Sequence, residues 1–462
     1  MFVDRTGELE GLERGYRGRA ARLVVIYGRR RVGKTALLTE FARGKSALQY
    51  TAEEATESVL LQQLSERAAE ASGQRYLAEA PFRTWEAFFG FLVEWAQRRR
   101  RLVILDEFPY LLQASPGLAS RLQKAWDERL KDIALMLVLC GSYVSVMEQE
   151  VLGHRSPLYG RRTGQLRLAP LDFFDASLML RSSPIARRVE AYAVLGGMPA
   201  YLAQFDARLD IFENIARHVL RREAFLYDEP RFVLLQELRE PRVYFSILRA
   251  LAFGDTRLND IAQHVGLDRT AVARYLDLLR ALSLVDRHVP ITEGVPEKSR
   301  KGLYQICDLF FRFWFRFVYP HATDLEAGRS EVVLQQRIRP AFNTFVGPVF
   351  EEVCRQWLRR VEGTPVWPVR HRALGRWWDR EHEIDLVGLG EQGEVLFGEC
   401  KWSEKPVGID VLESLRATSR LVPVEAKPEQ TVYVLFSKSG FTEAVKRHEG
   451  SNVRLVGLRE IE

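Results

Sequence analysis

The first third of the chain alternates short apolar runs with segments of helical periodicity. The apolar runs lie at residues 22–27, 101–105, 133–140 and 165–171, and a helical pattern at residues 35–42 follows the first of them. Continuous Val, Ile and Leu in short strands indicates a sheet that is covered on both faces, which is typical of parallel sheets flanked by helices. The pattern therefore predicts an α/β domain over residues 1–172.

The next segment, residues 173–240, is helical in pattern and is interrupted at residues 196–199, which read GGMP. We interpret it as a helical lid. Residues 241–308 then predict three short helices followed by a hairpin, which is the order of a winged helix-turn-helix. The helices are expected at residues 243–252, 258–265 and 269–282, and the hairpin strands at residues 284–289 and 302–306.

Aromatic residues recur at helical spacing over residues 308–320, which is typical of a core or interdomain helix. We therefore expect residues 309–345 to form an aromatic helical linker. Residues 346–462 show a helix, strands, a hairpin, a further strand, a helix and a strand. This order predicts a second α/β unit, so the chain as a whole is predicted to be a multidomain α/β protein.

Composition places the chain among globular proteins. Of its 462 residues, 47% are hydrophobic and 28% are charged, which excludes disordered, collagen-like and coiled-coil chains. No apolar run approaches the roughly 18 to 20 residues of a membrane span, and the N-terminus lacks an apolar signal segment. We therefore expect a soluble, cytoplasmic protein without a membrane partner. The four cysteines are far apart without a CxxC pair, which argues against a disulfide framework and a zinc site.

Residues 28–35 read GRRRVGKT and fit the phosphate-loop pattern G-x-x-x-x-G-K-[ST] between a predicted strand and a predicted helix. The glycines let backbone N–H groups face a triphosphate, Lys34 reaches its β and γ phosphates, and the Thr35 hydroxyl is a ligand for Mg²⁺. The sequence thus predicts ATP and Mg²⁺ as cofactors. The residues expected at the nucleotide from this segment are Gly28, Arg31, Val32, Gly33, Lys34, Thr35 and Ala36.

Two carboxylates follow the second apolar run, and a small polar residue follows the third. Asp106 is expected to hold Mg²⁺, directly or through water, and Glu107 to polarise the water that attacks the γ-phosphate. A plain surface turn is the alternative for this pair. Ser142 is placed to sense the γ-phosphate.

The predicted winged helix carries basic residues where a duplex would be contacted. Residues 268–282 form the expected recognition helix, with Arg269, Thr270 and Arg274 facing outward, and the following hairpin carries Arg300 and Lys301. Arginine suits phosphates and guanine edges, and the net charge of +6 permits nucleic-acid binding. DNA is the expected partner, although a contact with another protein is the alternative.

Near the C-terminus, two alternating strands joined by a turn bring acidic residues towards one end. Asp385 begins the first strand, and Glu399 and Lys401 lie two apart on one face of the second. Two carboxylates beside a lysine suit one or two Mg²⁺ ions and the cleavage of a phosphodiester. A structural ion pair between Glu399 and Lys401 is the alternative.

The segments GRRRVGKT, LVILDEFPYL, LVLCGSYVSVM and SPLYGRRTGQLRLAPL resemble the archaeal-type ATPase family, a branch of the STAND and AAA+-like P-loop ATPases. This resemblance implies a mononucleotide-binding core and a GxP signature near the adenine, which is matched by Gly197 and Pro199. It also implies an arginine at the γ-phosphate, for which Arg161 and Arg162 are candidates and a structural salt bridge is the alternative.

The spacing of Asp385, Glu399 and Lys401, with Glu351 on the preceding helix, resembles the PD-(D/E)xK nuclease superfamily. The wider segments GRWWDREHEIDLV and FGECKW resemble the DUF234-type C-terminal domain that accompanies archaeal-type ATPases. The resemblance implies a restriction-endonuclease-like fold, Asp385 and Glu399 as metal ligands, Lys401 as the catalytic lysine, and Glu351 as the helix carboxylate, with Glu352 as its alternative. Two departures are Ile384 in place of the name-giving proline and Cys400 between Glu399 and Lys401.

These features together predict an ATP-regulated protein that binds DNA and cleaves it with Mg²⁺ or Mn²⁺, in a defence or repair role. Two alternatives remain: an ATP-switched DNA-binding regulator, and a signalling adapter whose C-terminal domain is not catalytic. The sequence also leaves open a homo-oligomer and a protein partner.

Overall fold

The computed structural model describes residues 3, 5–238, 240–424, 427–450 and 452–462. They divide into two compact units. Residues up to Pro170, together with Met198–Ala200, form the first unit, and Leu171–Gly197, together with Tyr201–Glu462, form the second. Most of the segment interpreted as a lid therefore groups with the second unit, while residues 198–200, which include the Met and Pro of the GGMP interruption, group with the first.

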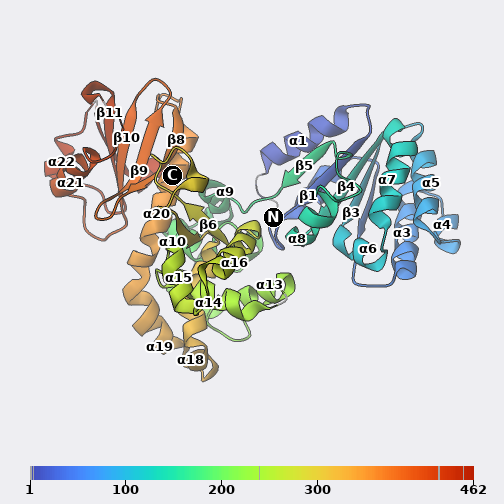
Figure 1. Ribbon diagram of the computed structural model, residues 1–462, viewed down its shortest axis with the longest axis horizontal. Helices are drawn as coiled ribbons and strands as arrows, with labels where there is room; N and C mark the ends of the chain where they lie inside the picture. Colours follow the sequence, from blue (N-terminus) through green and yellow to red (C-terminus); the bar gives the residue numbers. More distant parts are fainter. Residues whose placement is uncertain (1–2, 4, 239, 425–426, 451) are drawn as a thin grey trace. The chain divides into compact units, whose positions relative to one another are not determined.

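The first unit is built on a five-stranded parallel sheet in the order β2-β3-β4-β1-β5 (Figure 1). Three of its strands, β1, β3 and β4, are buried over nearly their whole length, because helices cover both faces of the sheet. The predicted parallel α/β fold is confirmed. The strands are β1 (Arg22–Tyr27), β2 (Ala47–Thr51), β3 (Arg101–Asp106), β4 (Leu135–Gly141) and β5 (Gly164–Arg167).

Strand β2 is not predicted by the apolar pattern. Leu48 and Tyr50 are buried, but Gln49 and Thr51 between and after them are exposed, so the strand has no continuous apolar run. The helices of this unit are α1 (Thr6–Arg17), α2 (Lys34–Ala42), α3 (Glu57–Ser72), α4 (Tyr76–Glu79), α5 (Trp85–Ala96), α6 (Phe108–Ala114), α7 (Leu118–Glu128) and α8 (Val144–Val146).

The second unit begins with helices. They are α9 (Phe173–Ser177), α10 (Ile185–Leu195), α11 (Pro199–Leu202), which crosses the boundary between the units, α12 (Ile211–His218) and α13 (Glu229–Glu237). Among the described residues, no helix combines the length and the apolar composition that crossing a bilayer requires.

Three helices and an antiparallel hairpin follow in the predicted order. They are α14 (Pro241–Ala252), α15 (Leu258–Val265), α16 (Arg269–Ala281), β6 (Val285–His288) and β7 (Leu303–Ile306). The loop between β6 and β7 contacts the C-terminal sheet: Ile291 N donates a hydrogen bond of 2.9 Å to Arg376 O, and the Ile291 side chain packs on the core of that sheet. The hairpin loop is therefore held against the C-terminal domain.

The aromatic segment is core. Phe310, Phe311 and Phe313 in α17 (Leu309–Phe313) are fully buried, and the Trp314 indole N–H donates to the carbonyl of Tyr227 at 2.6 Å. The helical path continues through α18 (Ala322–Glu326) and α19 (Ser330–Val333) into α20 (Arg339–Val361).

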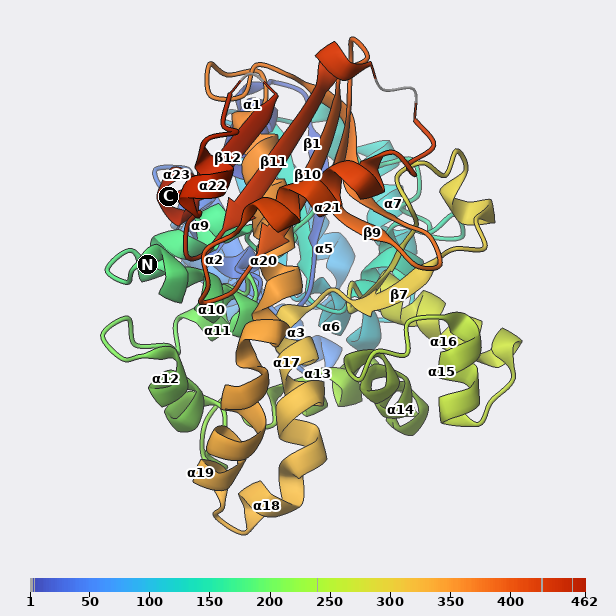
Figure 2. The same ribbon diagram turned by 90° about the vertical axis from the view of Figure 1, so that its left-hand side faces the viewer.

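The C-terminal part of the chain forms a separate mixed sheet, with the strand order β12-β11-β10-β9-β8 (Figure 2). β8 to β10 are antiparallel, and β10 to β12 are parallel. Helix α20 lies on one face and α21 (Ile409–Ser419) on the other. The remaining elements are β8 (His371–Trp378), β9 (Glu383–Gly390), β10 (Val395–Lys401), β11 (Thr431–Ser437), α22 (Glu443–Lys446), β12 (Val453–Gly457) and α23 (Leu458–Ile461).

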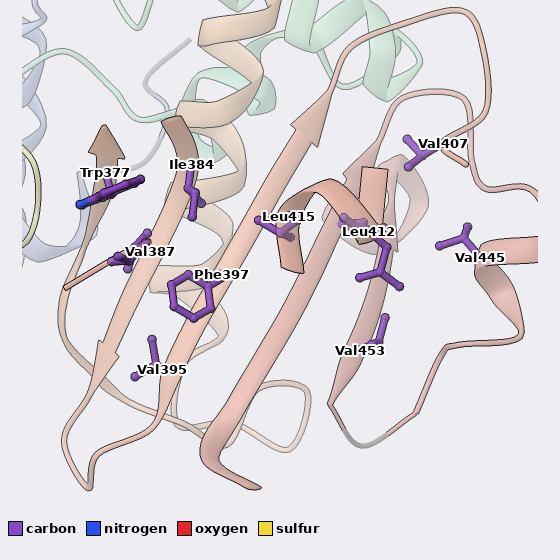
Figure 3. Packing of buried hydrophobic residues seen from close by; sticks show 12 residues of the cluster. Trp377, Ile384, Val387, Val395, Phe397, Val407, Leu412, Leu415, Val445 and Val453 are labelled. Carbon is purple, nitrogen blue, oxygen red and sulfur yellow. The ribbon is translucent and has the colours of Figure 1, made fainter. Parts of the chain in front are cut away.

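The core on the α21 face shows how β9 is shaped (Figure 3). Ile384 and Val387 both point into the cluster that contains Phe397 and Leu412, although three positions separate them along the strand. Regular alternation would place them on opposite faces. The pairing of β8 with β9 accordingly shifts between Gly375 and Trp377. This β-bulge lies at Asp385 and Leu386, and bulges of this kind redirect a side chain locally.

Candidate functional site

The phosphate loop leaves β1 and enters α2 through a curled backbone. Gly28, Arg31 and Gly33 have φ values of 156°, 69° and 98°. A Cβ at Gly28 would lie 2.4 Å from the carbonyl oxygen of Leu168, so that position excludes every side chain. A curled, glycine-bearing backbone of this kind forms an anion-binding concavity at a helix N-terminus.

The side chains of the loop and of the first turn of α2 differ in exposure. Val32 is fully buried, whereas Thr35 and Ala36 are exposed. Lys34 is 5% exposed, and its ammonium donates to the carbonyls of Gly28 at 2.8 Å and Arg29 at 2.9 Å. Burial lowers the pKa of Lys34. The lysine ammonium is thus held by the backbone of the phosphate loop itself.

The carboxyl ends of β1, β3 and β4 bring the other predicted residues to this loop. Thr35 Oγ1 donates to Asp106 Oδ2 at 2.7 Å, which joins α2 to the end of β3. Ser142, directly after β4, donates from Oγ to Glu107 Oε2 at 2.6 Å and from its backbone N at 3.3 Å. Lys34, Thr35, Asp106, Glu107 and Ser142 therefore meet at one edge of the sheet.

Pro199 also lies at the loop, since a Cβ on Gly33 would be 3.9 Å from its Cγ. Gly197, two residues earlier, is packed against the backbone of Leu171, where a Cβ would approach the carbonyl oxygen to 1.7 Å. The GGMP segment thus contacts the phosphate loop at its proline.

Arg161 and Arg162 are not brought to the phosphate loop. Arg161 pairs with Asp127 at 3.0 Å, and Arg162 donates to the carbonyl of Leu152 at 3.2 Å. The next residue, Thr163, bonds to Leu23 at the amino end of β1, the end opposite the loop. A strand of this length spans roughly 15 to 20 Å at about 3.3 Å per residue. In this structure the two arginines therefore make structural contacts within their own chain.

Sequence reasoning missed Arg5. This residue is 8% exposed, and its guanidinium donates to the carbonyls of Val32 at 3.1 Å and Ala169 at 2.7 Å and pairs with Glu8 at 3.0 Å. It braces the phosphate loop from the N-terminal segment. No local signal could have found it, because its carbonyl partners are 27 and 164 residues away along the chain.

The second unit presents the predicted basic face. Arg269, Thr270 and Arg274 are exposed on α16, while Leu276 and Leu279 on the other side of the helix are buried. In the hairpin loop, Arg300 is exposed and Lys301 pairs with Glu293 at 2.9 Å.

The C-terminal acidic residues gather around the start of β9, the end of β10 and α20. Asp385 Oδ2 accepts a hydrogen bond of 2.9 Å from Cys400 N, and Lys401 Nζ donates to Glu399 Oε1 at 2.6 Å. Glu351 Oε2 lies 3.5 Å from Arg376 Nε. Each carboxylate thus has a partner within the protein.

Glu351, and not Glu352, faces this cluster. Glu352 instead pairs with Arg355 at 2.7 Å and accepts from Gln356 at 2.8 Å, one turn along the same helix. Burial, followed by the charge of Asp385, raises the pKa of Glu351 to about 8. The structure therefore favours the first of the two predicted registers.

The remaining carboxylates are similarly disfavoured as anions. Burial, again followed by the charge of Asp385, raises the pKa of Glu399 to about 7, and burial raises the pKa of Asp385. Within the described ranges, no three His, Cys, Asp or Glu side chains surround a common cation position. A Mg²⁺ ion held by one or two carboxylates and several waters is compatible with this arrangement, and a cation would offset the buried negative charge.

Three family models match successive parts of the chain. Residues 2–205 match a family described as an ATPase domain predominantly from Archaea, and residues 314–419 match DUF234, described as archaeal and bacterial proteins of unknown function. Residues 186–304 match another domain of unknown function, DUF8612.

Two relatives come from Methanocaldococcus jannaschii. The uncharacterized protein MJECL04 is 34% identical over 405 residues, which are 87% of this chain and 88% of that protein. The uncharacterized ATP-binding protein MJ0423 is 53% identical over 45 residues, covering 10% of this chain and 76% of that protein. Among solved structures, the Walker-type ATPase PABY2304 of Pyrococcus abyssi has a TM-score of 0.51 at 21% identity, covering 68% of this chain and 96% of that one. The last likeness supports the P-loop ATPase fold.

Replacement of Lys34 by alanine tests the phosphate loop. Because Lys34 is the buried cation of the concavity, we expect Lys34→Ala to weaken ATP binding by roughly 10- to 100-fold, the cost of losing a charge-assisted hydrogen bond. Titration with a fluorescent ATP analogue measures this, and the exposed Lys124→Ala on α7 is the matched control. Unchanged affinity in Lys34→Ala would refute the assignment.

The raised pKa values of Glu351 and Glu399 predict a pH-dependent stability. Both lie above the ordinary 4.5, so the folded protein keeps protons that the unfolded chain releases. Their stabilising contribution is complete below about pH 4.5 and is lost as the pH rises through about 7 to 8. Without divalent cations, we expect the thermal unfolding midpoint of the second unit to fall between pH 5 and 8.5. Circular dichroism checks this, and Glu351→Gln should flatten the profile; a midpoint that rises over this range contradicts it.

Proposed function

The chain belongs to the family of ATPases found predominantly in Archaea that carry a C-terminal DUF234 domain, and from this premise we propose that it couples ATP binding and hydrolysis to DNA binding and metal-dependent DNA cleavage. The observation that carries the nuclease part is the meeting of Asp385, Glu399, Lys401 and Glu351 where β9, β10 and α20 adjoin.

At the ATPase centre, the chain supplies three functions. The curled loop and Lys34 bind the phosphates, and Lys34 exchanges its carbonyl partners for phosphate oxygens. Thr35 and Asp106, already in contact, would hold Mg²⁺, which supplies charge neutralisation at the β and γ phosphates. Glu107 accepts a proton from the attacking water.

DNA binding is supported by the second unit. Three helices and an antiparallel hairpin have the order of a winged helix, and α16 presents Arg269, Thr270 and Arg274 to solvent in the place of a recognition helix. The hairpin loop is hydrogen-bonded to β8 through Ile291 and Arg376, whereas the outer side of α16 is exposed. We therefore assign the first contact with a duplex to α16. Arg300 and Lys301 lie on the hairpin loop, which has the place of a wing in this order of elements.

Cleavage is assigned to the C-terminal sheet. Asp385 and Glu399 would hold Mg²⁺ or Mn²⁺, which activates water and neutralises charge on the scissile phosphate. Asp385 lies in the β-bulge of β9, and its carboxylate accepts a hydrogen bond from the Cys400 N–H. These two features hold the carboxylate beside the end of β10. Lys401, which is paired with Glu399, would donate to the negative charge that develops on the phosphate. Glu351 orients water from the helix.

A second function, an ATP-switched DNA-binding regulator, is favoured by one observation. The Lys401 ammonium and the Glu399 carboxylate form an ion pair at 2.6 Å, in which each offsets the charge of the other. A non-catalytic C-terminal domain would retain such a pair for stability alone.

Substitutions in the acidic cluster separate these functions. We expect Asp385→Asn and Lys401→Ala to lower Mn²⁺-dependent cleavage of linear DNA by at least about 100-fold, since each removes a group that acts on the scissile phosphate. ATP hydrolysis should be unchanged. Gel assays with linear, circular and single-stranded DNA, with and without ATP, measure the first effect, and phosphate release measures the second.

The exposed Glu413→Gln on α21 and Lys405→Ala are the controls for charge and position. Cleavage that persists in Asp385→Asn excludes the proposed site. If the wild-type protein binds duplex tightly but does not cut it under any of these conditions, the regulator is the correct function.

The DNA-binding surface has its own test. Arg269→Ala and Arg274→Ala should each weaken duplex binding and reduce the slope of log affinity against log salt by about 1 if they contact phosphates. Fluorescence anisotropy over a salt series measures both quantities. Arg420→Ala, an exposed arginine of the same unit, is the matched control. Equal slopes in all three variants would remove α16 from the interface.

A further inference from the structure

A cluster of polar side chains outside the recognised motif positions links the phosphate loop to the carboxylate that follows β3. Arg30, in the middle of the loop, donates from Nη2 to the hydroxyls of Tyr110 at 2.9 Å and Tyr143 at 3.1 Å. The two hydroxyls are 3.3 Å apart, and their rings meet edge to face with centroids 5.8 Å apart. The Arg30 guanidinium also lies over the Tyr143 ring at 5.0 Å.

The two tyrosines belong to the elements that carry the catalytic edge. Tyr110 is in the first turn of α6, three residues after Glu107, and Tyr143 directly follows Ser142. Arg30 therefore fastens the phosphate loop to two segments at once. Burial, followed by the hydrogen bond with Tyr110, raises the pKa of Tyr143 to about 12, so its hydroxyl stays protonated and uncharged.

The same guanidinium reaches Glu107 through one intermediate. Arg30 Nε donates to Ser142 Oγ at 3.4 Å, and that oxygen donates to Glu107 Oε2 at 2.6 Å. A serine hydroxyl has a single proton, so the arginine on its lone pairs fixes the direction in which that proton points. Ser142 is 1% exposed, which limits competition from solvent.

Glu107 needs such support because its backbone is unusual. Its φ is +52°, in the left-handed region that non-glycine residues rarely adopt, at the N-terminus of α6. As the general base of the function proposed above, on which this inference rests, Glu107 must also point its carboxylate at the water, and a half-buried glutamate keeps rotamer freedom unless it is held. Among the described residues, that carboxylate accepts hydrogen bonds from Ser142 alone, from its hydroxyl at 2.6 Å and from its backbone N–H at 3.3 Å.

We propose that Arg30, with Tyr110 and Tyr143, is a positioning residue for ATP hydrolysis: it orients Ser142, and through Ser142 it holds the Glu107 carboxylate for its reaction with water. The phosphate loop thereby acts on the general base as well as on the nucleotide. Arg30 contributes to the rate of the chemical step and not to the affinity for ATP.

Kinetics of the full-length protein test this directly. The double variant Tyr110→Phe/Tyr143→Phe keeps both rings and the Ser142 contact and removes the two hydroxyls that accept from Arg30 Nη2, and Arg30→Gln removes the guanidinium that donates to all three. We expect kcat for ATP hydrolysis to fall roughly 10-fold in each, the cost of about one charged hydrogen bond, while Kd for a fluorescent ATP analogue changes less than about twofold. The unchanged Kd also reports that the ATPase unit is folded. Arg30→Lys, which keeps the charge but lacks the fork of donors, should resemble Arg30→Gln. Tyr76→Phe, on an exposed ring remote from the loop, is the control.

A double-mutant cycle shows whether Arg30 acts on Glu107 through Ser142. Because Arg30 acts through Ser142, Arg30→Gln should have no additional effect on kcat in a Ser142→Ala background. Three outcomes overturn the proposal: additive effects in the cycle, a rise in Kd that accounts for the whole loss in Arg30→Gln, or wild-type kcat in the tyrosine double variant. The second would make Arg30 a phosphate-binding residue, and the third would reduce the cluster to packing.

Discussion

The hydrogen bond from Thr35 Oγ1 to Asp106 Oδ2, 2.7 Å long, is the contact on which the geometry of the ATPase unit depends. It joins the segments after β1 and β3, which are not neighbours, because β4 lies between them in the sheet. Strand β4 ends at Gly141, where a Cβ would lie 2.6 Å from Met147 Sδ and 2.8 Å from Pro109 Cδ. The missing side chain therefore leaves room for Met147 and for Pro109 of α6, the helix that begins directly after Glu107.

Both candidate sites hold their charges in pairs made within the chain. Lys34 donates to two loop carbonyls, Lys401 to Glu399, and Arg376 lies beside Glu351. A buried charge without a partner is costly, and these contacts keep that cost low in the absence of a ligand. A nucleotide or a cation therefore exchanges one partner for another. At the C-terminal cluster these pairs do not fully offset the cost of burying the carboxylates, because burial still raises the pKa of Glu351 to about 8 and that of Glu399 to about 7.

The parallel sheet could be predicted from the sequence because its signals are local: β1 and β3 are apolar between their ends, and β4 is apolar throughout. The residues that meet at its carboxyl edge were found from the same local signals, since Lys34 and Thr35 complete a loop motif after β1, Asp106 is the last residue of β3, and Ser142 directly follows β4. Contacts between distant segments were beyond that reasoning. The contacts of Arg5 and Arg30 are made with partners far along the sequence, and β2 lacks a continuous apolar run because its alternate positions are exposed. The roles expected of Arg161 and Arg162 were implied by the family resemblance alone, and in this structure their side chains contact Asp127 and the carbonyl of Leu152.

The hydrogen bond that attaches the hairpin loop to β8 also could not be predicted from local sequence patterns. It limits how the hairpin loop can move relative to the C-terminal sheet. Arg376 is used twice: its carbonyl accepts the Ile291 N–H, and its side chain lies beside Glu351 and Glu383. Gly375, next to it, leaves room for Ile291 against the strand. A ligand that displaces the loop between β6 and β7 must either break this hydrogen bond or move β8 with the loop. In the second case the guanidinium beside Glu351 moves as well, so the hairpin and the acidic cluster are mechanically connected through one residue.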